Sequence, residues 1–172
     1  PAFILILGGC IIPTLPSMAA RIAIVAIPCW ALYALTGILQ GTGQEVPPAV
    51  IGGFELLLWE IHPFTPLFAT VFLLAALMGG IFSLPCGNKR ETAIAYIYAG
   101  SAVGVTFSGD FISLFIYWEV MAIASTMIIF YGKTEEAYRA GLRYAAMHFL
   151  GGIFLMAGII GYTALRSEER RV

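Results

Sequence analysis

Charged residues are scarce in this chain. Only 11% of its 172 residues are Asp, Glu, Lys or Arg, against roughly a quarter in an ordinary soluble domain. Nine Lys and Arg and ten Asp and Glu are too few to give a soluble fold of this length a polar surface. The formal net charge of −1 leaves no basic surface to attract a polyanion, so we expect no nucleic-acid partner.

Cysteine and histidine are also rare. Cys10, Cys29 and Cys86 form no C-x-x-C pair and have no histidine nearby, so neither a disulfide framework nor a zinc site is predicted. The sequence has no phosphate-binding loop and no catalytic triad, and we expect no bound cofactor or metal. The apolar start of the chain has no basic residue before it and no small-residue cleavage site after it, which favours a retained segment over a signal peptide.

Long apolar runs dominate what is present. Hydrophobic residues make up 60% of the chain, and a helix needs about 20 residues of this kind in succession to cross a bilayer. We predict an all-α fold, a polytopic transmembrane helix bundle that forms a single domain. About six spans are expected, at residues 2–15, 17–40, 64–84, 92–108, 111–132 and 140–165.

The first of these runs is short and closed by Pro13 and Pro16. The alternative is therefore a five-span arrangement in which this run lies on the membrane surface. Residues 41–63 form the longest connection, an exterior loop. Its segment FELLLWEI is typical of either a short interfacial helix or an extended hairpin, with Trp59 suited to the headgroup region.

The distribution of Lys and Arg predicts the orientation of the chain. With six spans, cations in or near the short connections fall on one side, and the acids of the 41–63 loop fall on the other; the cations are Arg21, Lys89, Arg90, Lys133, Arg139 and Arg143. We therefore expect a cell (inner) membrane protein with this side in the cytoplasm and the N-terminus outside. The basic tail, Arg166 to Arg171, would then lie outside, whereas the five-span alternative leaves the tail cytoplasmic.

Glu119 interrupts the apolar run FISLFIYWEVMAIAS near the middle of the fifth span. A carboxylate there costs roughly 2.5–3.5 kcal/mol on insertion scales, so it must face protein or water. A carboxyl group in such a position is suited to load and release a proton. Thr126, seven residues later, returns to the same helix face. We predict a proton site at Glu119 supported by Thr126; the alternative is a structural hydrogen bond or an ion pair with a neighbouring helix.

Three residues of the sixth span could assist Glu119. Histidine is the residue type most often used for proton transfer, which suggests this role for His148, and Tyr144, one turn earlier, shares its helix face. Alternatively, His148 only hydrogen-bonds across a close helix contact beside Gly151 and Gly152. Arg143 is predicted either to face Glu119 from the adjacent helix as a modulating cation or to anchor the helix at the membrane interface.

Two segments carry a resemblance to a known family. They are YAGSAVGVTFSGDFISLFIYWEVMAIASTMIIFYG and AYRAGLRYAAMHFLGGIFLMAGI, in which a small-residue helix is followed by a Gly-Asp edge and an aromatic-W-E-hydrophobic centre. They resemble the proton-translocating, antiporter-like subunits shared by NADH:quinone oxidoreductase and the Mrp-type multisubunit cation/proton antiporters, with the Mrp D-type subunit as the best match. The run PFTPLFATVFLLAALMGGIFSL is similar to the third helix of that family.

The resemblance implies that Glu119 is the family's key carboxylate, that the N-terminus lies outside, and that the chain is a secondary transporter subunit rather than an enzyme. Its partners would be other membrane subunits, protons, Na⁺ or K⁺, and the lipid bilayer. The resemblance covers the first six of roughly fourteen helices, and the family's lysine on the seventh helix has no counterpart here. We thus expect the N-terminal part of a subunit, a split-gene product, or a subunit completed by a partner.

Other functions stay open. The chain could belong to a respiratory NADH dehydrogenase or hydrogenase-type complex, or act as a scaffold that helps such a complex to assemble without transporting ions. A membrane enzyme with its site in residues 41–63 would use Glu45, Glu55, Glu60 or His62.

Overall fold

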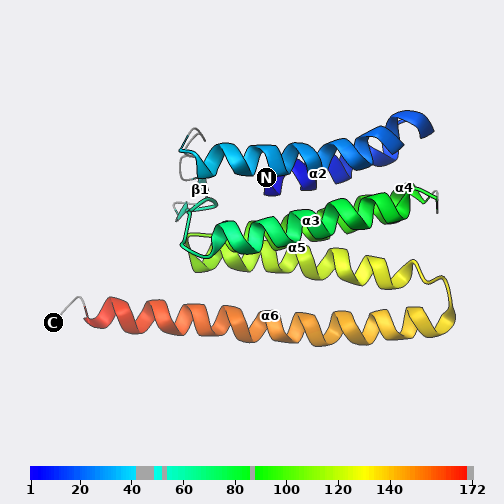
Figure 1. Ribbon diagram of the computed structural model, residues 1–172. Helices are drawn as coiled ribbons and strands as arrows, with labels where there is room; N and C mark the ends of the chain where they lie inside the picture. Colours follow the sequence, from blue (N-terminus) through cyan, green and yellow to red (C-terminus); the bar gives the residue numbers. More distant parts are fainter. Residues whose placement is uncertain (42–48, 52–53, 86–87, 170–172) are drawn as a thin grey trace.

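The computed structural model of the chain describes residues 1–41, 49–51, 54–85 and 88–169. Long α-helices lie side by side along one common direction (Figure 1), and the predicted all-α helix bundle is confirmed. The elements in chain order are α1 (Ala2–Ile11), a 3₁₀ turn η1 (Ile12–Thr14), α2 (Ser17–Leu39), β1 (Ala49–Ile51), β2 (Phe54–Leu56), α3 (Thr65–Ser83), α4 (Lys89–Phe107), α5 (Phe111–Phe130) and α6 (Glu135–Glu169).

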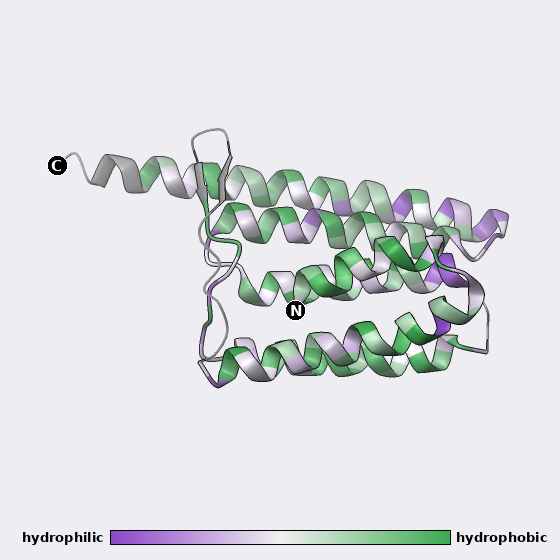
Figure 2. Ribbon diagram, turned by 90° about the horizontal axis from the view of Figure 1, so that it is seen from above, coloured by the Kyte–Doolittle hydropathy of each residue, from purple (hydrophilic) through white to green (hydrophobic). Residues whose placement is uncertain are grey.

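Four of the described helices, α2, α3, α5 and α6, are long and apolar enough to cross a membrane. Figure 2 shows their hydrophobic residues along the bundle, with hydrophilic residues gathered toward the end where α6 begins. Helix α1 is shorter. Helix α4 has a charged first turn and many small residues, but it takes the central position, packed against α1, α3 and α5. A helix surrounded by protein needs less apolar surface than one that faces lipid.

Two glycines of α4 allow its neighbours to pack closely. A Cβ atom on Gly100 would lie 2.7 Å from Ile6 Cγ1 of α1, and a Cβ atom on Gly104 would overlap the ring of Tyr117 of α5. Both distances are shorter than van der Waals contact, so α1 and α5 pack directly against the backbone of α4. This packing fixes α5, the helix that carries Glu119, against the centre of the bundle.

A buried hydrogen bond joins α4 to α2. The hydroxyl of Tyr96 donates to the backbone carbonyl of Ile24. Pro28 lies inside α2 four residues after Ile24, and proline has no N–H with which to bond the carbonyl of residue i−4. Tyr96 therefore supplies the donor that the proline lacks.

The segment after α2 forms the extended hairpin, one of the two expected alternatives, rather than a short helix. Strands β1 and β2 pair antiparallel with Ile51 opposite Phe54. The residues that follow pack on the α4–α5 connection, where the N–H of Gly109 donates to the carbonyl of Leu57 at 2.8 Å and Trp59 stacks on Phe107 at 4.0 Å. Four residues considered above, Glu45, Cys86, Arg170 and Arg171, lie outside the described residues.

Asp110 caps the N-terminus of α5. Its Oδ1 accepts from the N–H groups of Ile112 and Ser113, each at 2.8 Å, and its Oδ2 accepts from the Ser113 hydroxyl and the Leu57 N–H, each at 2.6 Å. Partial burial alone would raise the pKa of Asp110, but these hydrogen bonds to the charged form outweigh it and hold the pKa below its ordinary value. The cap thus joins the hairpin segment to the start of α5.

Helices α4 and α6 begin before the apolar runs expected at residues 92 and 140. Helix α4 starts at Lys89 and α6 at Glu135. The hydroxyl of Thr134 accepts from the N–H of Ala137 at 3.0 Å, and Arg139 pairs with Glu135 at 3.1 Å. Apolar residues mark only the membrane-buried part of a helix, whereas caps and exposed ion pairs extend it into water. At 35 residues, α6 is about 52 Å long.

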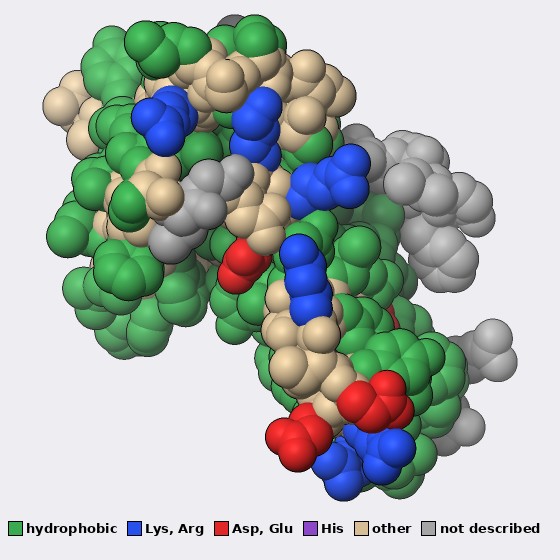
Figure 3. Space-filling model, turned by 90° about the vertical axis from the view of Figure 1, so that its right-hand side faces the viewer, with side chains coloured by type: hydrophobic (Ala, Val, Ile, Leu, Met, Phe, Trp, Pro, Cys, Tyr) green, Lys and Arg blue, Asp and Glu red, His purple; other side chains and the backbone are tan. Residues whose placement is uncertain are grey.

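Helices α2, α4 and α6 begin at the same end of the bundle (Figure 1). That end carries Arg21, Lys89, Arg90, Lys133, Arg139 and Arg143. Figure 3 views this end and shows Lys and Arg side chains spread across it, with fewer acidic ones. We call it the cationic end. The hairpin and Glu60 lie at the opposite end.

Candidate functional site

Glu119 lies near the middle of α5 and faces α6. The rise of an α-helix puts it roughly 12 Å from Phe111 and roughly 16 Å from Phe130, the two ends of α5. A Cβ atom on Gly152 of α6 would lie 3.2 Å from Glu119 Cδ and closer still to Oε1. The missing side chain at residue 152 therefore allows the Glu119 carboxyl to lie directly on the backbone of α6.

Glu119, Thr126 and His148 line one groove between α5 and α6, with a volume of about 480 Å³. Thr126 does not contact the carboxyl through its hydroxyl, which donates to the carbonyl of Ala122 at 2.9 Å. The rest of the lining is apolar, from Ile123 and Met127 of α5 to Phe149 of α6. The structure thus brings together the predicted proton site, its supporting threonine and the predicted histidine.

His148 is held between two aromatic rings. The ring of Trp118 on α5 stacks on it at a centroid distance of 5.9 Å, and the ring of Tyr144 stacks on it at 5.3 Å. The Tyr144 and Ser125 hydroxyls are hydrogen-bonded at 3.0 Å, which also links Tyr144 to α5. Tyr144 therefore orients His148 through ring contact, and these contacts fix the histidine against the Glu119 helix.

Two buried polar atoms of this groove have no protein partner. Among the residues that the structure describes, Glu119 Oε1, His148 Nε2 and Tyr117 Oη are the buried side-chain atoms without a hydrogen bond. Buried polar groups normally pair with protein or with ordered water. A carboxyl oxygen and an imidazole nitrogen in this condition are chemically suited to exchange protons with water or with a further chain.

Arg143 does not contact Glu119. Its side chain is exposed on α6, nine residues before Gly152, which corresponds to roughly 13 Å along the helix. Within the described ranges Arg143 forms no ion pair. At an effective dielectric constant of about 20, charges at such a distance interact by only about 1 kcal/mol.

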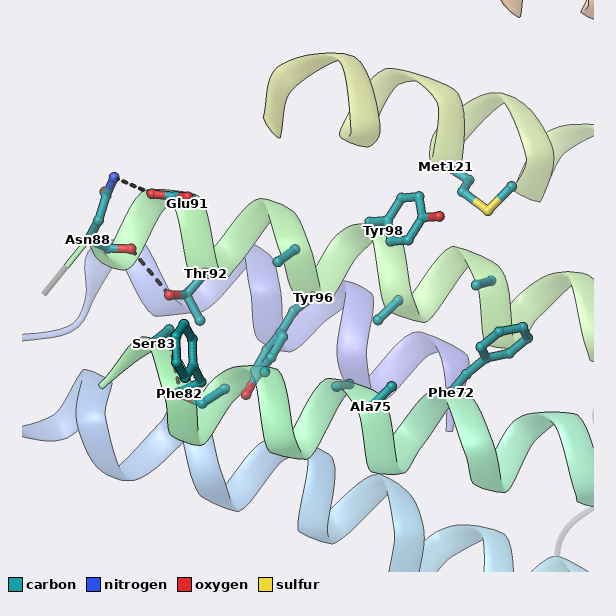
Figure 4. A pocket seen from close by; sticks show the side chains of 16 residues that line it. Phe72, Ala75, Phe82, Ser83, Asn88, Glu91, Thr92, Tyr96, Tyr98 and Met121 are labelled. Atoms are coloured by element: carbon teal, nitrogen blue, oxygen red, sulfur yellow. Dashed lines mark hydrogen bonds between the residues drawn. The ribbon is translucent and has the colours of Figure 1, made fainter. Parts of the chain in front are cut away.

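A second groove, of about 560 Å³, lies between α3 and α4 and also contacts Met121 of α5. Figure 4 shows that Phe72, Phe82 and Tyr98 lie around it and that its polar groups gather at one end. The acid there is partnered, because Asn88 Nδ2 donates to Glu91 Oε2 at 2.9 Å. This groove therefore has no buried unpaired acid comparable to Glu119.

The hairpin region forms no comparable site in the part of the chain that is described. Glu60 and His62 lie 3.9 Å apart, but about half of each side chain is exposed. Across the described ranges, no three His, Cys, Asp or Glu side chains are grouped so that they could hold a metal ion.

Three contacts of the site were not predicted from the sequence. They are those of Gly152 with Glu119, of Trp118 with His148 and of Ser125 with Tyr144. The pair Gly151 and Gly152 was the available signal, but a sequence does not show which of two adjacent glycines faces the neighbouring helix.

Comparison with known proteins places α5 and α6 in a family. Residues 108–168 match the transmembrane family of NADH:quinone oxidoreductase and Mrp antiporters. The D-type subunit of the Na⁺/H⁺ antiporter of Bacillus subtilis is 26% identical over 136 residues, which are 73% of this chain and 27% of that protein. The D-type subunit of the Na⁺/H⁺ antiporter of Alkalihalophilus pseudofirmus is 28% identical over 102 residues, which are 54% of this chain and 21% of that protein.

A third relative, an uncharacterized protein of Methanocaldococcus jannaschii, is 32% identical over 72 residues, which are 42% of this chain and 15% of that protein. The chain thus spans less than a third of the length of each of these curated relatives.

The fold also matches a solved structure. A chain of the membrane-bound sulfane sulfur reductase, an archaeal respiratory membrane complex, superposes with a TM-score of 0.72 and 21% identity over 90% of this chain and 34% of that chain. At this identity the likeness concerns the fold alone. Together with its long apolar helices, these relatives identify a multi-pass membrane protein. The chain is similar to the antiporter-like membrane subunits found in NADH:quinone oxidoreductases and Mrp antiporters, and the family match itself covers the segment of α5 and α6.

Proposed function

We propose that this chain is part of a subunit of a multisubunit cation/proton antiporter and that protons move through Glu119. The observation that carries the proposal is the position of this carboxyl group, in the middle of a membrane-type helix with Oε1 buried and without a protein partner among the described residues. An acid in these surroundings marks an ion pathway by default. The two relatives named as D-type subunits of Na⁺/H⁺ antiporters support an antiporter with Na⁺ as the exchanged cation, and K⁺ is the alternative.

In this proposal the groove between α5 and α6 is the local proton path. Water in the groove carries the proton between Glu119 and His148, which both line it. Thr126 adds a hydroxyl on the same wall, Tyr144 orients the imidazole, and Arg143 stabilises the charged carboxylate weakly from its distance. The positive-inside rule supports a cytoplasmic cationic end and an outer N-terminus, in the cell membrane. Other membrane subunits of the complex are the partners.

The test uses vesicles that contain the assembled complex and a pH-sensitive dye. Glu119→Gln keeps the shape of the side chain and removes its proton exchange. We expect cation-driven proton movement to fall at least roughly tenfold in Glu119→Gln, and as much in Glu119→Ala. The matched control is Glu135→Gln, an exposed acid at the start of α6, which should transport normally.

The same vesicles separate transport from a scaffold function. If Glu119→Gln co-purifies with the other subunits and transports at the wild-type rate, the proton role is excluded. If the variant fails to assemble but any assembled complex transports normally, Glu119 acts in assembly.

A redox-driven respiratory complex is the second candidate, because the matched family also includes NADH:quinone oxidoreductases. The antiporter and the redox-driven complex differ in the energy source for proton movement. A Na⁺ or K⁺ pulse without an electron donor should move protons in an antiporter, whereas a redox-driven complex should respond only to the donor. Glu119→Gln should lower either response at least roughly tenfold.

A further inference from the structure

A hollow at the cationic end gathers three cations from different parts of the chain. Lys89 and Arg90 come from the first turn of α4, and Lys133 comes from the connection between α5 and α6. Pro13, Phe130 and Tyr131 add apolar and aromatic surface to the wall, and Asn88 also lines it. Its volume of about 650 Å³ lies within the usual range for small-ligand sites. We call it the basic hollow.

The cations of the basic hollow are not neutralised by the chain. Across the described residues, none of the three forms an ion pair with an acid. Lys89 Nζ donates to the backbone carbonyl of Leu15 at 2.8 Å, which positions the ammonium group without cancelling its charge. The nearby acid Glu91 lines the α3–α4 groove and accepts from Asn88. The hollow therefore presents a net positive field.

The three cations of the basic hollow, unpaired among the described residues, point to an anionic ligand. No described side chain caps the N-terminus of α4, so the N–H groups of its first turn add to the positive field, which the first-turn acid Glu91 partly offsets. Lys133 has a φ angle of 54°, a left-handed conformation in the turn that ends α5, and this turn brings its side chain to the first turn of α4.

We propose that the basic hollow binds the headgroup of an anionic phospholipid. The hollow lies where α4 begins and α5 ends, the level at which a span leaves the hydrocarbon and meets the headgroups. Basic pockets between membrane helices on the cytoplasmic side are suited to such headgroups. Pro13, Phe130 and Tyr131 in the wall of the hollow itself give the start of the acyl chains an apolar surface next to the headgroup. This proposal does not depend on proton transfer at Glu119.

The test measures the binding of spin-labelled phosphatidylglycerol and phosphatidylcholine to the purified complex by electron paramagnetic resonance. The wild type should prefer phosphatidylglycerol. Arg90→Gln and Lys133→Gln should each lower this preference about fivefold, the effect of one surface cation on anionic-lipid affinity. The control Arg139→Gln removes a cation at the same end that pairs with Glu135 and should change the preference less than twofold.

Lys133→Gly separates binding from folding. Glycine tolerates the left-handed backbone, so this variant should be at least as heat-stable as the wild type in phosphatidylcholine and should still lose the lipid preference. Inorganic phosphate, added against a chloride control of equal ionic strength, should leave phosphatidylglycerol bound. The proposal would be overturned if the wild type bound both lipids equally or if Arg139→Gln lost as much lipid preference as Lys133→Gln. It would also be overturned if Lys133→Gly kept the preference for phosphatidylglycerol or if phosphate displaced this lipid.

Discussion

At the scale of single residues, the contact between Glu119 and Gly152 decides how the carboxyl group is held. The backbone N–H groups in the middle of α6 already bond within the helix, so Gly152 covers Oε1 without donating to it. Contact without a hydrogen bond excludes bulk water but leaves the oxygen able to accept a proton. A glycine supplies this cover because any larger residue would occupy the position of the carboxyl group.

The adjacent glycines of α6 provide a matched test of this contact. Gly152→Ala places a Cβ atom against Glu119 Oε1, whereas Gly151 has open space around the same position. A displaced reacting group can cost roughly a hundredfold in rate, so we expect at least a tenfold loss of proton transport in Gly152→Ala. Gly151→Ala should transport within about twofold of the wild type. Equal rates for the two variants in dye-loaded vesicles would show that the contact has no part in transport.

At the scale of elements, the Tyr96–Ile24 hydrogen bond shows how a side chain of one helix satisfies a backbone carbonyl of another. Helix α2 loses a backbone donor at Pro28, and α4 supplies one from a side chain. The sequence shows the proline, but it does not show which distant hydroxyl donates to the carbonyl of Ile24, because that depends on the packing between α2 and α4.

We therefore expect Tyr96→Phe to lower the stability of the chain. The change leaves the carbonyl of Ile24 buried without a donor, which costs about 1–3 kcal/mol. Pro28→Ala restores a backbone N–H in α2, so Tyr96→Phe should cost less in a Pro28→Ala background. Thermal unfolding in detergent, followed by circular dichroism, measures both costs. Identical costs in the two backgrounds would mean that Tyr96 does not compensate for the proline.

The cap of α5 should make stability depend on pH. Hydrogen bonds hold the pKa of Asp110 below its ordinary value, so its stabilisation is complete above the unfolded pKa of about 3.9 and is lost as the pH falls through the lower folded pKa. Asp110→Ala should cost about 1 kcal/mol at pH 7. Asp110→Asn keeps capping capacity but does not titrate.

The unfolding temperatures of wild type and Asp110→Asn, compared from pH 7 to pH 3, check this expectation. The wild type should be the more stable at pH 7, and the gap should narrow as the pH falls below 4. A gap that stays constant over this range would show that the charge of Asp110 does not stabilise the cap.

At the scale of the whole molecule, apolar runs predict the helices well because burial in lipid requires them. Residues 92–108 were predicted as a span, but their sequence does not show that α4 occupies the centre, which follows from the contacts of Gly100 and Gly104 with α1 and α5. Glu119 is recognisable in the sequence because an acid in an apolar run is rare. The contact of Glu119 with Gly152 cannot be recognised in the sequence, because it depends on the register between α5 and α6.

Helix α6 lies at the flank of the bundle, and its substantial contacts in the described chain are with α5 (Figure 1). Large apolar side chains, among them Met147, Phe149 and Phe154, stay more than two-thirds exposed along it. A helix is only about 10 Å thick, so a neighbour that docks on this outer surface would sit one helix diameter from the buried carboxyl group. A small tilt or rotation of α6 on docking would uncover or seal the acid, and assembly itself would then set when the group can meet water.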